Sequence, residues 1–218
     1  MTIRREWAMP SANTFEIAPI RSLLARYVKR GDCIVDPFAN RNRIGTITND
    51  LDPSFDTTYH LDALEFLRLL PDESADLVLY DPPYSPRQVA ECYKAFGMTV
   101  NMETTQGSYW SRQKREIARI LKPRAFAISF GWNTNGIGKK NGMEIAEVLL
   151  VAHGGVHNDT ICTVEQKAPT IFDFHDLQAA SAATARGGLP ATPGAGLSAL
   201  ADGFDRAGGH FHSRTVTE

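Results

Sequence analysis

The sequence predicts an α/β protein built on a mostly parallel sheet with one antiparallel strand. Two observations lead to this class. Short apolar segments of strand character alternate with segments of helical spacing over most of the chain, which is typical of strand–helix–strand units. The last two apolar segments are joined by a short stretch rich in turn residues, 154–159, which favours a hairpin and therefore a reversed final strand.

Each expected strand begins with a short apolar or β-branched run. Seven strands are expected, at 33–35, 45–50, 59–61, 75–80, 125–132, 146–153 and 160–165. Apolar residues at helical spacing predict helices between them. These helices are expected at 19–29, 63–70, 86–96 and 109–121.

Composition sets the domain organisation. The 218 residues fit one domain of ordinary size with some peripheral sequence, and a hydrophobic content of 43% is enough for a sizeable core. From residue 170 the sequence is rich in Ala and Gly and offers little to bury. We therefore expect one domain at 1–169 and a partly flexible appendage at 170–218.

Charge and cysteine usage narrow the class of protein. A net charge of −2 means that any nucleic-acid binding must come from a local patch. The three cysteines, Cys33, Cys92 and Cys162, are odd in number and far apart, which argues against a disulfide framework or a zinc site and favours a reducing compartment. We find neither a signal-peptide pattern nor an apolar run of membrane-spanning length, so we expect a cytoplasmic protein without a membrane partner.

Asp81-Pro82-Pro83-Tyr84 is the most informative part of the chain. It follows an apolar run, 75–80, and so should lie at the carboxyl end of a strand, where open α/β sheets bind their ligands. The Asp81 carboxylate and the Pro82 carbonyl can each accept a hydrogen from an exocyclic amine. The prolines fix φ and carry no N–H donor, and Tyr84 offers a ring for stacking. The alternative is a strand-end turn with a packed tyrosine.

These residues are similar to the D-P-P-Y signature of amino-methyltransferases that use S-adenosylmethionine. Upstream, Asp-Pro-Phe-Ala-Asn at 36–40 resembles the D-P-F-x-G-x-G cofactor loop of DNA amino-methyltransferases, although Asn-Arg-Asn-Arg at 40–43 replaces the glycines. The order of motifs over 13–84 resembles that of the small, often phage- or prophage-type, N6-adenine DNA methyltransferases, and the string at 81–88 is especially similar. The resemblance implies a Rossmann-like S-adenosylmethionine-dependent methyltransferase fold, a bacterial, archaeal or phage-infected cell, and a place in restriction–modification.

The resemblance also implies a set of cofactor-binding residues. Asp36 would bind the ammonium of the cofactor's methionine portion, and Asp50, or Asp52 as a second choice, would accept both ribose hydroxyls. Asp62 would accept from the adenine amine, although an N-cap for the following helix is an equally open role. Asn40 can adopt the left-handed backbone that a missing glycine requires. The implied set is Phe15, Asp36, Pro37, Phe38, Asn40, Asp50 and Asp62, with Phe15 also a candidate core residue.

The implied catalytic residues are Asp81, Pro82, Pro83 and Tyr84. Their target would be the N6 amine of an adenine flipped out of the duplex. Hydrogen bonds to Asp81 and Pro82 would stabilise the charge that develops on nitrogen during methyl transfer. No covalent cysteine is needed, and no cysteine follows a proline as the cytosine-C5 enzymes require.

Any element that reads nucleic acid must follow Tyr84, because about 40 residues separate the two motifs. Region 85–145 contains ten basic and four acidic residues, an excess that suits phosphate contact. A basic helix near 109–115 could equally be a solvated surface. The residues that we expect to contact nucleic acid are Arg87, Asn133, Asn135, Lys139 and Lys140.

Several alternatives stay open. The same motif serves enzymes that methylate guanine N2 in RNA, and adenine N6 in RNA or cytosine N4 would use similar contacts. A non-catalytic nucleic-acid-binding module with a degenerate cofactor site is a second class, although Asp36, Asp50 and Asp81 are all present. The recognition region is small, so a homodimer or a partner protein could supply specificity.

Overall fold

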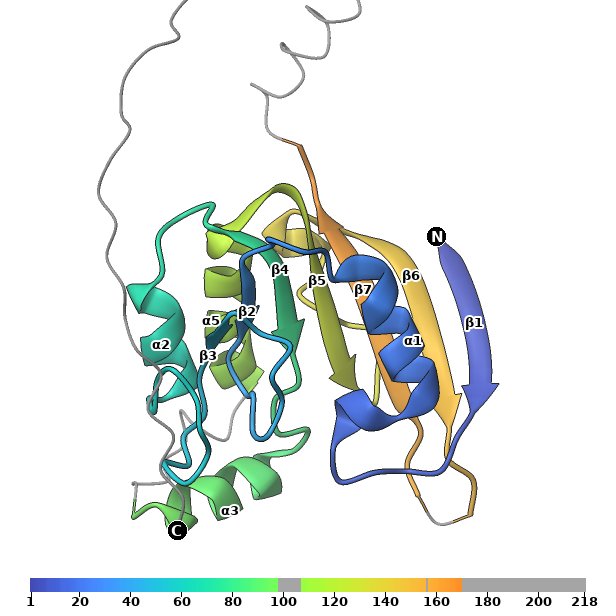
Figure 1. Ribbon diagram of the computed structural model, residues 1–218, viewed down its shortest axis with the longest axis horizontal. Helices are drawn as coiled ribbons and strands as arrows, with labels where there is room; N and C mark the ends of the chain where they lie inside the picture. Colours follow the sequence, from blue (N-terminus) through green and yellow to red (C-terminus); the bar gives the residue numbers. More distant parts are fainter. Residues whose placement is uncertain (98–106, 156, 170–218) are drawn as a thin grey trace, which may run out of the picture. The chain divides into compact units, whose positions relative to one another are not determined.

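The computed structural model describes residues 1–97, 107–155 and 157–169, which form a sheet with helices on its two faces (Figure 1). The strands are β1 (Thr2–Trp7), β2 (Ile34–Asp36), β3 (Ile47–Thr48), β4 (Ala75–Tyr80), β5 (Leu121–Gly131), β6 (Met143–Ala152) and β7 (Thr160–Lys167). The helices are α1 (Ala18–Tyr27), α2 (Ala63–Leu69), α3 (Pro86–Ala95) and α5 (Gly107–Ile120), with short 3₁₀ helices η1 (Thr14–Glu16) and η2 (Lys139–Asn141). The appendage expected at 170–218 lies outside the described residues.

The sheet has the predicted class. Its seven strands follow the order β1-β6-β7-β5-β4-β2-β3. All neighbouring strands are parallel except at β7, which runs antiparallel to both β5 and β6. A mostly parallel seven-stranded sheet with one antiparallel hairpin strand is therefore confirmed.

One of the seven strands is not where the sequence predicted it. The segment expected as a third strand at 59–61 makes only an isolated bridge, between Asn49 and Tyr59. The seventh strand is instead β1, which pairs in parallel with β6 from Thr2 to Trp7. Every residue of β1 is exposed, so this edge strand carries three charged side chains and no continuous apolar run that could have revealed it.

Central strands are buried on both faces. In β4, Leu77 and Leu79 pack with Ile20 of α1, whereas Val78 and Tyr80 pack on the opposite face with α2 and α5. This alternation follows from the two-residue period of a strand, and complete burial is typical of a parallel sheet. The two packed faces fix the carboxyl ends of β2 and β4, where α3 also lies (Figure 1).

The connection between β5 and β6 runs from the carboxyl ends of the strands to their amino ends. β5 and β6 point the same way because both run antiparallel to β7. Residues 132–142 therefore start at the carboxyl end of β5 and finish, through η2, at the amino end of β6. Glu165, which is 1% exposed, holds this connection by accepting hydrogen bonds from the backbone N–H groups of Ile137 and Gly138.

Within the described ranges, every helix is too short or too polar to cross a lipid bilayer.

Candidate active site

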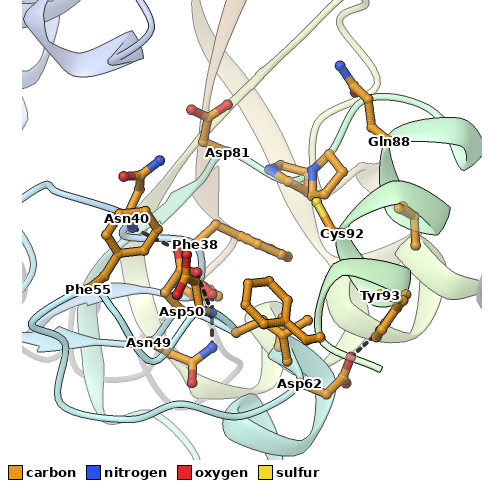
Figure 2. Close-up of a pocket in the computed structure, with 18 of the residues that line it drawn as sticks. Phe38, Asn40, Asn49, Asp50, Phe55, Asp62, Asp81, Gln88, Cys92 and Tyr93 are labelled. Carbon is orange, nitrogen blue, oxygen red and sulfur yellow. Dashed lines mark hydrogen bonds between the residues drawn. The ribbon is translucent and has the colours of Figure 1, made fainter. Parts of the chain in front are cut away.

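A cavity of about 460 Å³ lies at the carboxyl ends of β2, β3 and β4 (Figure 2). Its volume is within the range of small-molecule sites. Four aspartates line it, namely Asp50, Asp52, Asp62 and Asp81, and none of the described lining residues is Lys, Arg or His. We call this the acidic cavity. Its charge suits a ligand that is cationic and rich in hydrogen-bond donors.

The predicted catalytic motif forms one wall of the acidic cavity. Asp81 follows the last residue of β4, and Pro82, Pro83 and Tyr84 line the cavity beside it. The Tyr84 N–H donates to the side-chain oxygen of Gln88 (2.7 Å), and the Trp110 indole N–H donates to the Pro83 carbonyl (3.1 Å). The second half of the motif is therefore held by α3 and α5.

A hydroxyl group contacts the Asp81 carboxylate. The Tyr84 hydroxyl donates a hydrogen bond to Oδ1 of Asp81. Burial raises the pKa of Asp81, and the hydrogen bond from the Tyr84 hydroxyl opposes that rise by stabilising the charged form. The Tyr84 ring meets Trp132 edge-on, with ring centroids 5.5 Å apart. Trp132 is 45% exposed, so the outer side of this ring pair is open to solvent.

Asn40 lies in the loop that lacks the expected glycines. This residue adopts φ of 49°, the left-handed backbone that the sequence analysis allowed for Asn. Its N–H donates to Oδ2 of Asp50 (2.8 Å), while Oδ1 of Asp50 accepts from the N–H of Asp52 (2.9 Å). Each oxygen keeps a second lone pair. Asp50 can therefore brace the loop and still accept a ligand hydroxyl.

Asp36 and Phe15 lie outside the cavity lining. Asp36 is fully buried; its Oδ1 accepts from the Phe38 N–H (3.1 Å), and its Oδ2 accepts no hydrogen bond from the described residues. Burial, with a smaller contribution from Asp81 and Asp50, raises the pKa of Asp36 well above its usual value. Phe15 packs against Phe130 in the core, with ring centroids 4.9 Å apart. Their neighbours Phe38 and Thr14 line the cavity.

Asp62 stands at the end of the acidic cavity away from Asp81 (Figure 2). Oδ1 of Asp62 accepts from the N–H of Leu64 (2.9 Å), which makes it the N-cap of α2 that the sequence allowed. Its other oxygen accepts from the Tyr93 hydroxyl, and the Tyr93 and Tyr109 hydroxyls are 3.2 Å apart. The cap and the cavity roles are therefore compatible, since one oxygen faces each.

Sequence analysis missed several residues of the acidic cavity. Asn49 is fully buried and donates to the carbonyls of Pro37 (3.1 Å) and Leu61 (3.0 Å), so it fixes the strand ends that form the cavity floor. Other lining residues that were not predicted include Phe55, Gln88, Cys92, Tyr93 and Tyr109. The signal available for Tyr93 was its position on the apolar stripe of the helix predicted at 86–96.

The residues expected to contact nucleic acid do not gather around the acidic cavity. Arg87 pairs with Glu91 on the surface of α3 (2.8 Å), and Asn133 caps its own turn by accepting from the Asn135 N–H (2.9 Å). Lys139 and Lys140 belong to η2, which precedes the amino end of β6. Tyr84 lies at the other end of the strands, after the carboxyl end of β4. The predicted polar loop therefore begins near Tyr84, at the carboxyl end of β5. Its two lysines lie at the opposite end of the strands.

A second cavity, of about 430 Å³, lies at the amino ends of β4 and β5. Four cations line it, Arg26, Lys29, Lys122 and Arg124, together with Asp32, Asp76 and apolar residues. Lys122 donates to Asp76 (2.6 Å), and this bond lowers the pKa of the Asp76 carboxyl. We call this second cavity the basic groove.

Comparison with known proteins gives structural matches alone. No family model and no curated protein matches the sequence. Solved structures with a similar backbone include TrmN from Thermus thermophilus, at 15% identity and a TM-score of 0.47 over 69% of this chain and 49% of that chain. Another is 1,6-didemethyltoxoflavin-N1-methyltransferase from Burkholderia thailandensis, at 10% identity and a TM-score of 0.47 over 69% and 77%.

A third match is an S-adenosylmethionine-dependent methyltransferase from Methanosarcina mazei, at 12% identity and a TM-score of 0.43 over 68% of this chain and 98% of that chain. The chain spans about half the length of the TrmN chain. Identities and TM-scores this low carry no argument about activity. The fold therefore depends on the strand order, and the function on the residues of the acidic cavity.

Proposed function

We propose that the protein transfers a methyl group from S-adenosylmethionine to the exocyclic N6 amine of adenine in DNA. The observation that carries this proposal is the acidic cavity, where four carboxylates and no basic side chain among the described residues stand at the carboxyl ends of parallel strands. Such a lining repels phosphate-bearing cofactors and favours a cation. S-adenosylmethionine carries an ammonium, a sulfonium, a ribose diol and an adenine amine, and supplies an electrophilic methyl group.

Three residues would hold the cofactor. Asp50 is braced by Asn40 and presents free lone pairs for the ribose hydroxyls. Asp62 offers Oδ2, beside the Tyr93 hydroxyl, to the adenine amine. Phe38 lines the same cavity, between Asp81 and Asp50 in Figure 2, and offers a ring against which an adenine can pack.

Asp81 and Pro82 would receive the target amine. The carboxylate and the carbonyl each accept one N–H, which favours a pyramidal nitrogen and stabilises the positive charge that develops as the methyl group arrives. A route through a cysteine is disfavoured, because burial raises the pKa of Cys162 and of Cys92 and keeps both thiols protonated. The arrangement therefore supports direct transfer to an amine.

DNA adenine as the substrate is supported by the resemblance of residues 13–84 and 81–88 to N6-adenine DNA methyltransferases. The Tyr84 ring beside Asp81, packed against Trp132, suits a planar base better than an amide side chain. An RNA base amine would make the same contacts. Region 85–145 favours neither, because several of its basic residues, including Arg119 and Lys122, are engaged in ion pairs.

The alternative is a non-catalytic nucleic-acid-binding module. Calorimetric titration with S-adenosylmethionine separates the two, because the proposal requires saturable binding and the module does not. Asp81→Ala should retain cofactor affinity and lose methyl transfer by at least a hundredfold. Asp76→Ala, in the basic groove, is the matched control and should retain both. Undiminished methyl transfer by Asp81→Ala would contradict the proposed mechanism.

A further inference from the structure

Strand β1 is the outer strand of the sheet and carries exposed apolar side chains. In the strand order it has one neighbour, β6, and Figure 1 shows it at the margin of the sheet. Eight large apolar side chains are exposed within the described residues, and four of them gather here, namely Met1, Ile3, Trp7 and Met9. A gathered apolar patch marks an interaction surface, whereas scattered apolar residues do not.

The backbone of β1 leaves alternate hydrogen-bonding groups for a second partner. The Ala8 N–H donates to the Ala152 carbonyl (3.1 Å), so it points at β6. The pairing with β6 is continuous from Thr2 to Trp7, and successive residues of a strand turn their backbone groups to opposite sides. The N–H and C=O groups of the odd-numbered residues therefore point away from β6. Such an unpaired row can accept another strand.

The side chains of β1 divide between two faces. Arg4 lies on the face covered by α1, because its guanidinium meets Glu147 (2.9 Å), which also pairs with that helix. Glu6 shares this face, since side chains alternate along a strand, and the odd-numbered residues from Ile3 to Trp7 lie on the other face. The first face therefore carries two opposite charges. The second carries a large apolar side chain at each end.

The sequence of β1 is complementary to itself in one antiparallel register. A two-fold axis perpendicular to the sheet would add a second β1 to the edge, with each Arg5 opposite the Arg5 of the other copy. In that register each Arg4 lies opposite Glu6 of the second copy, and each Ile3 lies opposite Trp7 of the second copy. Opposite-charge pairs and aromatic–β-branched pairs stabilise antiparallel strands.

The two neighbouring registers lack these charge pairs. Centring the axis on Arg4 or on Glu6 also places one pair of like charges opposite each other, and it brings no opposite charges together. Centring it on Arg5 offsets the single like-charge pair with two opposite-charge pairs. Charged residues on an edge strand ordinarily discourage pairing. In β1 they disfavour other registers and favour one.

We propose that a second copy of this chain pairs with this edge, with the two β1 strands antiparallel about Arg5 in one continuous sheet. The proposal goes beyond methyl transfer and does not depend on it. β1 and the cavity strands β2, β3 and β4 stand at opposite ends of the strand order, so the interface leaves the acidic cavity open. The axis reverses strand direction, so the two cavities open in opposite directions. A pairing of six residues is small, so we expect a Kd on the order of micromolar.

The first test is sedimentation equilibrium of the full chain with a matched pair of substitutions at Arg5. Both Arg5→Pro and Arg5→Thr remove the side chain, but only proline removes the N–H that faces the second copy. Proline is tolerated on an edge strand at such a position, and thermal unfolding checks that the variant is folded. Arg5→Pro should raise the dimer Kd at least about tenfold. Arg5→Thr should dimerise at least as tightly as the wild type, because it removes the like-charge pair.

The second test concerns the register. Glu6→Lys places a cation opposite Arg4 twice in each dimer and should raise the Kd about tenfold. Glu16→Lys makes the same change of charge at an exposed position of η1, and it should leave the Kd within about twofold. In the registers centred on Arg4 or Glu6, the substitution at Glu6 gains no repulsion. An unchanged Kd in Glu6→Lys would therefore overturn the register.

Amide hydrogen exchange identifies the occupant of the edge. The N–H groups of Ile3, Arg5 and Trp7 should be protected above the Kd and exchange freely below it. Protection that is independent of concentration would assign the edge to residues 170–218 of the same chain and overturn the second copy. A monomer at every concentration would overturn the proposal, and so would equal Kd values for Arg5→Pro and Arg5→Thr. These measurements require no methyl transfer, so they stand apart from the test of the proposed function.

Discussion

The acidic cavity lies at the carboxyl ends of the strands and the basic groove at their amino ends, and the two carry opposite charge. They are similar in volume, about 460 and 430 Å³, yet the first is lined by four aspartates without a described cation and the second by four cations with two aspartates. In the basic groove, Asp76 is paired with Lys122. In the acidic cavity, no described aspartate has a cationic partner.

This difference indicates that the aspartates of the acidic cavity do not contribute to stability through ion pairs with the described residues. Unpaired carboxylates at close quarters raise one another's free energy, and the fold retains them at the one edge where parallel strands end. Paired carboxylates at the other edge contribute to stability instead. The same type of substitution, aspartate to asparagine, should therefore have different effects on cofactor affinity and on stability at the two ends of the strands.

The largest contrast is expected in cofactor affinity. Asp50→Asn removes a charge and one acceptor that brace Asn40, so the Kd for S-adenosylmethionine should rise about 10- to 100-fold. Asp76→Asn should leave that Kd within about twofold, because Asp76 lies at the other edge. Calorimetric titration measures both, and equal effects of the two substitutions would break the comparison.

A second contrast concerns stability and its dependence on pH. The raised pKa of Asp36 means that its contribution to stability is present below its unfolded pKa and is lost as pH rises through the folded pKa. Asp36→Asn should therefore raise Tm at pH 8, by about 2–4 °C for roughly 1 kcal/mol, with a smaller gain at pH 4. Thermal unfolding at the two pH values checks this.

Asp76 has the opposite sign. Its lowered pKa means that its contribution is present above the unfolded pKa and is lost as pH falls through the folded pKa. Asp76→Asn should lower Tm at pH 8 by less than about 2 °C, since the Lys122 pair is partly exposed, and the deficit should vanish towards pH 3. A gain in Tm at pH 8 would contradict the assignment of Asp76 to a stabilising pair.

The smallest expected effect on cofactor affinity concerns the Tyr93 hydroxyl, which contacts Asp62. Tyr93→Phe removes the donor to Asp62 Oδ2 and should weaken S-adenosylmethionine binding about three- to tenfold. Tyr27→Phe is the matched control, because Tyr27 lines the basic groove and its hydroxyl donates to Glu147 (3.0 Å). Equal affinities for the two variants would remove Tyr93 from the account.

Sequence alone placed the residues whose position depends on strand ends. Three aspartates lie at the ends of strands that were predicted from the sequence, namely Asp50, Asp62 and Asp81. Because the carboxyl ends of parallel strands lie at the same end of a sheet, a common cavity could be expected. Asn40 likewise takes the left-handed backbone that its residue type permits. Local chemistry was sufficient for these residues.

Residues whose position depends on tertiary packing could not be found this way. Thr14 lines the acidic cavity next to Phe15, which is buried against Phe130 of β5. Lys139 and Lys140 lie at the amino ends of the strands because Glu165 accepts hydrogen bonds from the N–H groups of Ile137 and Gly138, 28 and 27 residues earlier in the chain. Strand β1 is a polar edge strand, and its pairing with β6 leaves no periodic apolar signal.

The measurement that tests the central claim most directly is identification of the methylated product. The protein is incubated with methyl-labelled S-adenosylmethionine and, separately, with unmethylated duplex DNA and with RNA, and the nucleosides are analysed after digestion. The account predicts N6-methyladenine in DNA with the wild-type protein and its loss with Asp81→Ala. Label in no nucleoside, or equal labelling by the wild type and Asp81→Ala, would contradict it.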